Sequence, residues 1–271
     1  MATCKICNGH SDPFSDAVIL TKYRIEYFRC VSCGFIQTED PYWLNEAYQS
    51  AIADIDIGPV DRSITISIKM RALILGFFDH RKAFLDYGAG YGILVRRMRD
   101  LGFDFKYHDA HCTNLFAKDF AGTLSGKNEF ELITAVEVIE HLEQPFETME
   151  MLLRNTSNVF FTTEVLPDYT PKPNQWWYYA LNHGQHISLF SKRALNIMAE
   201  RVGKRIYTDG SLHLITEEKI SRRVYQTILK PNWALMIGAA LTKAKKVQSL
   251  LSSDFENISG LRLTNKPEDA S

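Results

Sequence analysis

The sequence lacks a long apolar run, a marked excess of charge and a large number of cysteines. Its longest apolar run, Trp233 to Leu241, is far shorter than the ~20 residues that a membrane-spanning helix needs. The N-terminal stretch, Met1 to His10, contains no apolar core of the kind found in secretory signals. A net charge of -1 excludes a general electrostatic attraction to nucleic acid. These absences predict a cytosolic protein without a transmembrane segment.

The few cysteines that are present indicate a metal site rather than a disulfide framework. Only five occur in 271 residues, and thiols in the cytosol are kept reduced. Cys4 and Cys7 form one Cys-x2-Cys motif, and Cys30 and Cys33 form a second. Between the two motifs apolar residues alternate with polar ones, as they do in a hairpin. Four thiolates match the tetrahedral coordination of zinc and leave no open position. We therefore predict a zinc ribbon at residues 1–45 with a structural metal, and Cys112 remains an ordinary thiol.

The charge of this ribbon bears on its partners, because zinc ribbons often bind nucleic acid. Residues 1–50 carry four basic and six acidic side chains, a net charge of -2. A surface that follows phosphates needs the opposite sign. The charge disfavours nucleic acid, and we interpret the ribbon as a scaffold or as a lid on the substrate side.

A glycine-rich turn follows a short apolar run at residues 84–92, which read Phe-Leu-Asp-Tyr-Gly-Ala-Gly-Tyr-Gly. Glycine allows positive φ and lets a ligand approach the backbone closely. The P-loop pattern Gly-x4-Gly-Lys-Ser/Thr is absent. The dinucleotide pattern Gly-x-Gly-x-x-Gly also fails, because its last position is Ile93 or Val95. What remains is Asp-x-Gly-x-Gly-x-Gly, which begins at Asp86.

Apolar runs and helical patterns alternate around this turn. The predicted strands are 83–87, 103–108, 130–138 and 158–163, and the predicted helices are 62–78, 93–101 and 145–153. This succession predicts a doubly wound parallel sheet that binds ligands at the carboxyl ends of its strands. Asp109 follows the second strand, 23 residues after Asp86. Nucleotide-binding α/β folds place an acid that binds ribose hydroxyls about there.

The glycine turn, Asp109 and the segment 130–142 together resemble the motifs of class I S-adenosylmethionine (SAM)-dependent methyltransferases. The resemblance covers about residues 60–215 and implies an enzyme with an α/β, Rossmann-like doubly wound domain at 46–215. It implies SAM as the cofactor, with the residues placed as follows: the methionine part at Asp86, Gly88, Gly90 and Gly92, the ribose at Asp109, and the amino-acid part beside Val136 and Glu137. The segment 120–129 departs from the family, because it has no clear acidic residue at the usual strand-three position.

A proline-containing segment with four consecutive aromatic residues follows the last of these strands. Trp176 to Tyr179 supply flat apolar faces with polar handles, which either hold a sugar or planar substrate or cover the sheet as an aromatic plug. A helical turn would bring His183 and His186 to one side, but no third metal ligand is nearby in the sequence. The run 184–191 resembles a segment of zinc-ribbon methyltransferases, including sugar C-methyltransferases, which implies that His186 is a general base. The alternative is that His186 only orders the loop.

Two further segments flank the central domain. The connector 41–60 contains Tyr48, which either packs against the ribbon or closes over the cofactor. The helical C-terminal tail, 216–271, has seven basic and no acidic residues between 219 and 249. Its apolar spacing predicts amphipathic helices that dock or form a homodimer, with attraction to an anionic substrate or membrane surface as the alternative. Its last residues, 265–271, are expected to be frayed.

Three functions agree with these patterns. The favoured one is a SAM-dependent methyltransferase that modifies an oxygen or carbon atom of a small-molecule or sugar-type acceptor. The second is an RNA methyltransferase that binds RNA through the ribbon, which the ribbon's negative charge disfavours. The third is a SAM-binding module without catalytic activity. No motif in the sequence identifies the methyl acceptor.

Overall fold

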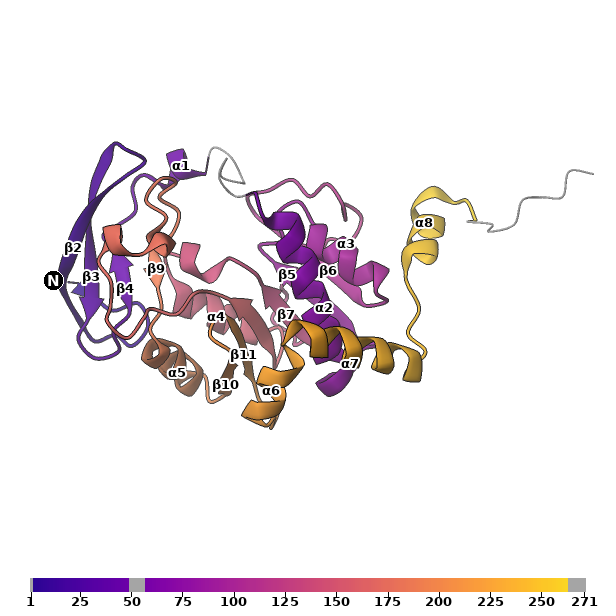
Figure 1. The fold of residues 1–271 in the computed structure, drawn as a ribbon. Helices are drawn as coiled ribbons and strands as arrows, with labels where there is room; N and C mark the ends of the chain where they lie inside the picture. Colours follow the sequence, from indigo (N-terminus) through magenta and orange to yellow (C-terminus); the bar gives the residue numbers. More distant parts are fainter. Residues whose placement is uncertain (1, 49–56, 263–271) are drawn as a thin grey trace, which may run out of the picture.

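A computed structural model describes residues 2–48 and 57–262 of the chain (Figure 1). Most of the connector predicted at 41–60 is covered, but its part 49–56 lies outside the described residues, as does the tail end 265–271. Two sheets form the frame of the molecule. The N-terminal sheet lies at one end in Figure 1, and a larger sheet covered by helices lies beside it.

The N-terminal sheet confirms the hairpin that the alternating pattern predicts. β2 (His10–Ile19) and β3 (Tyr23–Cys30) pair antiparallel, and β1 (Ala2–Thr3) and β4 (Ile36–Thr38) extend the sheet on either side. A fifth strand, β9 (Ser188–Leu189), comes from far along the chain and pairs with β4. The residues predicted as a separate ribbon therefore share a sheet with β9, which follows the loop that carries His186.

The larger sheet has six strands in the order β10-β11-β8-β7-β5-β6. Its strands are β5 (Ala83–Tyr87), β6 (Asp104–His108), β7 (Leu132–Ala135), β8 (Val159–Thr162), β10 (Arg205–Thr208) and β11 (Leu212–Thr216). The four strands β6, β5, β7 and β8 are parallel, as the alternating βα pattern predicts. The sheet is mixed at one edge, where two strands that the sequence did not predict, β10 and β11, are added and β11 runs antiparallel to both β8 and β10. The turn between β10 and β11 is too short for a crossover, so these strands must be antiparallel.

Two details of the sheet differ from the predicted strands. β7 ends at Ala135, three residues earlier than predicted, and Glu137 has a positive φ of 55° that extended backbone does not allow. In the described part of the 120–129 segment, where the methyltransferase fold usually has a third strand, there is an isolated bridge from Ala121 to Tyr107. The segment that lacks the family's acidic residue in the sequence thus also lacks a regular strand in the structure.

Helices cover both faces of the larger sheet, because the side chains of a buried strand alternate between two cores. Phe84 packs into the core formed with helices α2 (Pro59–Phe77), α3 (Ile93–Asp100), α6 (Arg222–Ile228) and α7 (Pro231–Ala244). The next residue, Leu85, packs into the opposite core with helices α4 (Pro145–Leu153) and α5 (Lys192–Arg201). That second core also contains Cys4, Cys30 and Phe35 of the N-terminal sheet, so the ribbon packs directly on the central domain.

The C-terminal tail is helical, as predicted, and it docks within its own chain. α7 packs along α2 and buries Ala234 and Gly238. The last helix, α8 (Leu251–Ser259), stands apart from the body of the molecule in Figure 1 and is held to α3 through Asp254. A homodimer through these helices stays a prediction.

Candidate active site

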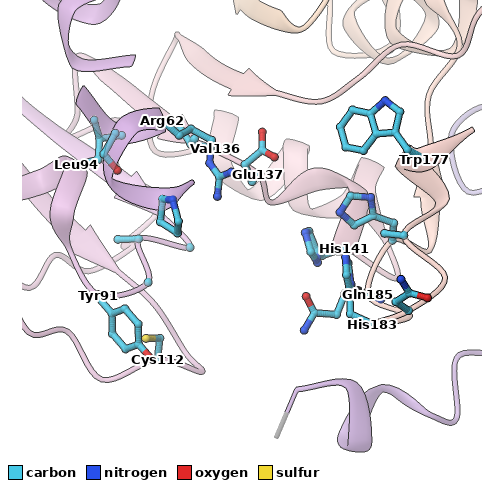
Figure 2. Close-up of a pocket in the computed structure, with 18 of the residues that line it drawn as sticks. Arg62, Tyr91, Leu94, Cys112, Val136, Glu137, His141, Trp177, His183 and Gln185 are labelled. Atoms are coloured by element: carbon cyan, nitrogen blue, oxygen red, sulfur yellow. Dashed lines mark hydrogen bonds between the residues drawn. The ribbon is translucent and has the colours of Figure 1, made fainter. Parts of the chain in front are cut away.

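A cavity of about 910 Å³ lies at the carboxyl ends of β5 and β7, where the parallel sheet is expected to bind ligands. The glycine turn after β5 lines one side of it. The loop between β8 and β9 lines the other side, and the first turn of α2 contributes Arg62. Figure 2 shows this arrangement: Tyr91, Leu94 and Cys112 stand opposite His141, His183 and Gln185.

The three glycines of the turn have different surroundings. All three have positive φ, between 55° and 85°. A Cβ at Gly90 would meet nothing within 4 Å, so its backbone is open to a ligand. A Cβ at Gly88 would come within 2.6 Å of Val138, and one at Gly92 within 2.3 Å of the Asn114 amide. Gly88 and Gly90 border the cavity, whereas Gly92 allows close packing at the start of α3.

Asp86 borders the cavity from the end of β5, yet its side chain is 3% exposed. Its Oδ1 accepts a hydrogen bond of 2.5 Å from the hydroxyl of Thr134 on the neighbouring strand. Burial raises the pKa of this carboxyl to about 7, and the hydrogen bond from Thr134 offsets only part of that rise. The position predicted for the methionine part of SAM therefore carries a carboxyl that is easily protonated.

Asp109 lies beside the glycine turn but not on the cavity lining. Its Oδ2 accepts a hydrogen bond of 2.8 Å from the amide of Gly90. Its Oδ1 accepts two more, from the amides of His111 and Cys112. The acid predicted to bind ribose thus fixes the turn to the loop after β6.

Val136 and Glu137 follow β7 directly, and both line the cavity. The amide of Glu137 donates to Oγ1 of Thr162, and that hydroxyl donates to the Glu137 carboxylate at 2.6 Å. These two bonds hold Glu137 in its left-handed conformation, which costs a residue with a side chain about 1–3 kcal/mol. The strain and its compensation mark Glu137 as a positioned group.

Three polar side chains meet beside the cavity, and two of them, His141 and His186, line it. Glu140 and His141 lie on the 3-10 helix η1 (Ile139–His141) just after β7, and His186 lies on the loop before β9. One ligand atom from each lies within 4.8 Å of the others. The sequence near His186 offers no third ligand, and the fold brings Glu140 and His141 beside His186 from elsewhere in the chain. The signal for Glu140 and His141 in the sequence is their position just past the end of a parallel strand.

Burial determines the charge of these groups. It lowers the pKa of His186 to about 4 and that of His141 well below its usual value. It raises the pKa of Glu140, which is fully buried, and the nearby charge of Glu137 adds to the rise. Both imidazoles are therefore neutral near pH 7, with a lone pair available on each ring.

The four aromatic residues of this segment divide into a buried pair and a pair that lines the cavity. Tyr178 and Tyr179, on the 3-10 helix η3 (Trp177–Tyr179), are 1% exposed and pack against the N-terminal sheet as a plug. Trp176 and Trp177 line the cavity, and Trp177 is 74% exposed. The shorter 3-10 helix η2 (Pro173–Gln175) precedes them. His183 and His186 are not on a helix, although their rings lie 5.3 Å apart.

The four ribbon cysteines come together as their spacing predicts. All four sulfur atoms lie within 4.8 Å of one another, with Cys4 3.5 Å from Cys33 and Cys7 3.4 Å from Cys30. Sulfurs that bind one zinc ion at 2.3 Å are about 3.8 Å apart. The amide of Cys33 also points at the Cys30 sulfur. The cluster is suited to a tetrahedral metal ion.

The parallel sheet, the glycine turn and the cavity at the strand ends define a class I methyltransferase fold with an added N-terminal four-cysteine sheet. Residues 66–208, more than half of the chain, match the family described as "Methyltransferase domain". The chain belongs to this family, and SAM is the cofactor that the family implies. The predictions of the fold class and of a SAM-dependent methyltransferase domain are confirmed.

Similar solved structures include several methyltransferases. TnmH is 16% identical with a TM-score of 0.45, and the similarity covers 66% of this chain and 62% of that one. Human N-acetylserotonin methyltransferase in complex with SAM is 11% identical with a TM-score of 0.42, covering 65% and 66%. The plantazolicin methyltransferase BpumL is 13% identical with a TM-score of 0.41, covering 64% and 94%. The chain thus spans somewhat less than two thirds of the first two relatives.

No curated protein matches the chain. Among the helices in the described residues, none combines the length and apolar character that crossing a membrane requires.

Proposed function

We propose that this protein transfers a methyl group from SAM to an oxygen or carbon atom of a small-molecule or sugar-type acceptor. One observation carries the proposal: a single cavity has the glycine turn on one side and aromatic and histidine side chains on the other. A volume of about 910 Å³ is at the upper end of the range for ligand pockets, so it is compatible with a cofactor and a small acceptor together. Bound SAM supplies an electrophilic methyl group on its sulfonium.

For the side of the cavity that binds SAM, the proposal keeps the assignments made from the sequence. Gly90 supports the placement of SAM, because its backbone is open to the cavity. Glu137 supports the amino-acid assignment, because its carboxylate lines the cavity and is held by Thr162. Asp109 retains lone pairs that can accept hydrogen bonds from ribose hydroxyls while it fixes Gly90.

The acceptor side offers a stacking face and a base. Trp177 presents an exposed indole ring to the cavity, suited to a sugar or planar molecule. His186 binds the carbonyl of Tyr178 through Nδ1 at 2.7 Å, which leaves its other ring nitrogen as the basic one. The neutral imidazole can take the proton of an acceptor hydroxyl as the methyl group arrives. The protein's main contribution is to position the two reactants.

The ribbon has a structural part in this proposal. Its four thiolates would hold one zinc ion with no open position, so the metal orders the sheet and takes no part in methyl transfer. The cytosolic location expected from the sequence stays a prediction.

We test the cofactor assignment with Asp109→Asn. Calorimetry should show SAM binding to the unmodified chain and binding at least about tenfold weaker in the variant, because a charged acceptor of hydrogen bonds is lost. Asp119→Asn, at an exposed acid on the following loop, is the matched control and should bind normally. Equal affinity of all three proteins would remove Asp109 from the site.

The acceptor class is tested separately with methyl-labelled SAM. We expect label in small molecules or nucleotide-linked sugars and none in RNA. Label in RNA would favour the second function, and SAM binding without turnover on any pool would favour the third.

A further inference from the structure

Glu140, His141 and His186 form a cluster that the zinc ribbon does not account for. Their ligand atoms lie within 4.8 Å of one another, and both histidines line the cavity. Donor atoms about 2.1 Å from one tetrahedral ion are about 3.4 Å apart. Movements of at most about 0.8 Å by each donor atom would therefore bring all three onto a common ion.

The two imidazoles are already oriented as metal ligands are. A ligating histidine donates its second ring N–H to an oxygen, which fixes the ring and the tautomer. In His186, Nδ1 lies 2.7 Å from the carbonyl oxygen of Tyr178. In His141, Nδ1 lies 3.0 Å from the hydroxyl of Tyr48, and Nε2 lies 3.9 Å from Oε1 of Glu140. Both rings thus have one nitrogen anchored and the other available.

Glu140 supplies an independent observation. Its side chain is 0% exposed, and neither carboxylate oxygen has a hydrogen-bond partner among the described residues. A buried carboxylate without partners is unfavourable, and either protonation or a bound cation relieves that cost. The imidazole nitrogens of His141 and His186 beside Glu140 suit a cation. The backbone carbonyl of Glu140 accepts a hydrogen bond from Ile187, which ties η1 to the loop that carries His186.

We propose that Glu140, His141 and His186 bind a divalent transition-metal ion within the cavity, separate from the four-cysteine site. Two imidazole nitrogens and one carboxylate suit ions such as Zn²⁺ or Co²⁺ better than Mg²⁺ or Ca²⁺, which prefer oxygen ligands. Three protein ligands leave positions open, as in sites where a metal binds water or substrate. The open positions are available to an acceptor from the cavity.

This metal site would add a catalytic group to the proposed methyl transfer. Its role in catalysis therefore rests on the proposed function. An acceptor hydroxyl bound to the ion has a lowered pKa and releases its proton to solvent. The oxygen then forms its bond to the methyl carbon as the carbon–sulfur bond of SAM breaks, and S-adenosylhomocysteine leaves. The free nitrogen of His186 cannot bind an ion and accept a proton at once, so in the metal-bound enzyme the ion replaces the imidazole as the activator of an oxygen acceptor.

The test is a titration of the full chain, with its ribbon metal in place, with Co²⁺ and without SAM or acceptor. Calorimetry should find one further ion per chain, and visible absorption should show ligand-field bands without the intense near-ultraviolet bands of cobalt thiolates. Co²⁺ should also raise the unfolding temperature, because it binds the folded chain. Methyl transfer is not measured, so a failure of the proposed function leaves this result unaffected.

Three variants identify the ligands. His141→Ala, His186→Ala and Glu140→Gln should each weaken Co²⁺ binding by more than about 100-fold. Loss of a group that only hydrogen-bonds to a metal ligand already lowers metal affinity by about 10- to 100-fold. His80→Ala, at the turn beyond the far end of α2, is the control and should bind as the unmodified chain does. Unfolding temperatures without metal show whether each variant is folded. Absence of a second ion in the unmodified chain, thiolate bands alone, or unchanged binding in folded variants would each overturn the proposal.

Discussion

The carboxyl of Asp86 illustrates how one residue's surroundings set its chemistry. It ends a strand between two other parallel strands, so both faces of the sheet and the glycine turn shield it from water. Among the described residues, its side chain is hydrogen-bonded to the hydroxyl of Thr134, which is a neutral donor. Burial therefore dominates and the pKa rises to about 7.

A pH dependence of stability follows from that rise. In the unfolded chain the carboxyl ionises near its ordinary pKa of 3.8, but in the folded chain it stays protonated up to about pH 7. The folded state binds more protons in this window, so the contribution of Asp86 is fully present below about pH 4 and is lost as the pH rises to 7.

We expect Asp86→Asn to remove this dependence. The difference in unfolding free energy between variant and unmodified chain should shift in favour of the variant by up to about 4 kcal/mol between pH 4 and pH 7. Urea unfolding at several pH values without SAM measures it, and Asp119→Asn serves as the exposed control. A difference that does not change with pH would show that Asp86 ionises normally in the folded chain.

At the scale of elements, the N-terminal sheet and the loop between β8 and β9 are joined by strand pairing and hydrogen bonds. β9 pairs with β4 only two residues after His186. The indole N–H of Trp43 donates to the carbonyl of Gly184 at 2.8 Å, and the Gln185 amide donates to the carbonyl of Ala47. The ribbon therefore positions the loop that carries the acceptor side of the cavity, which supports its interpretation as a scaffold.

Loss of the ribbon metal should affect the acceptor more than the cofactor. Cys30→Ser, or removal of zinc with a chelator, should disorder the N-terminal sheet, since a segment of this size depends on its metal to fold. SAM affinity should change by less than about threefold, because the glycine turn belongs to the other sheet. Turnover should fall by about 100-fold, the effect of a misplaced substrate.

Metal analysis, SAM calorimetry and a labelled-methyl assay measure these three quantities. Cys112→Ser lies outside the four-cysteine cluster and should keep its zinc. Less than about one zinc per unmodified chain, or full turnover without zinc, would contradict the structural role.

Across the whole molecule, the last helix is joined to the central domain by charge. Arg99 on α3 is 8% exposed and donates to both carboxylate oxygens of Asp254, at 2.6 and 2.8 Å. Burial alone would raise the pKa of the Asp254 carboxyl, but hydrogen bonds from Arg99 and Arg96 more than offset it, so the pKa lies below its usual value. Arg99 also binds Asp104 at the start of β6.

Asp254→Asn should lower the free energy of unfolding by about 3 kcal/mol, the lower end for breaking a buried pair, because Asp104 still holds Arg99. Glu256→Gln, on the exposed side of the same helix, should change it by less than about 0.5 kcal/mol. Urea unfolding measures both. Equal stability of the two variants would mean that α8 does not depend on the ion pair.

Local sequence patterns were sufficient to predict several strands, helices and motifs of this molecule. The strand 83–87 and the helix 145–153 are found at their predicted bounds, because apolar runs between turn residues report burial directly. The glycine turn and the cysteine pairs were identified because their spacing has few physical explanations. The antiparallel edge strands were missed, since pairing direction depends on where a short turn returns the chain.

The side of the cavity that we propose for the acceptor is assembled only in the tertiary structure. Glu140 and His141 are 45 or more residues away from His186, and no local pattern relates them. They meet because one segment leaves the end of β7 and the other is fixed by pairing with the N-terminal sheet. The glycine turn consists of neighbouring residues, so the sequence alone identifies it. A cluster of side chains from distant segments forms only when the whole chain packs.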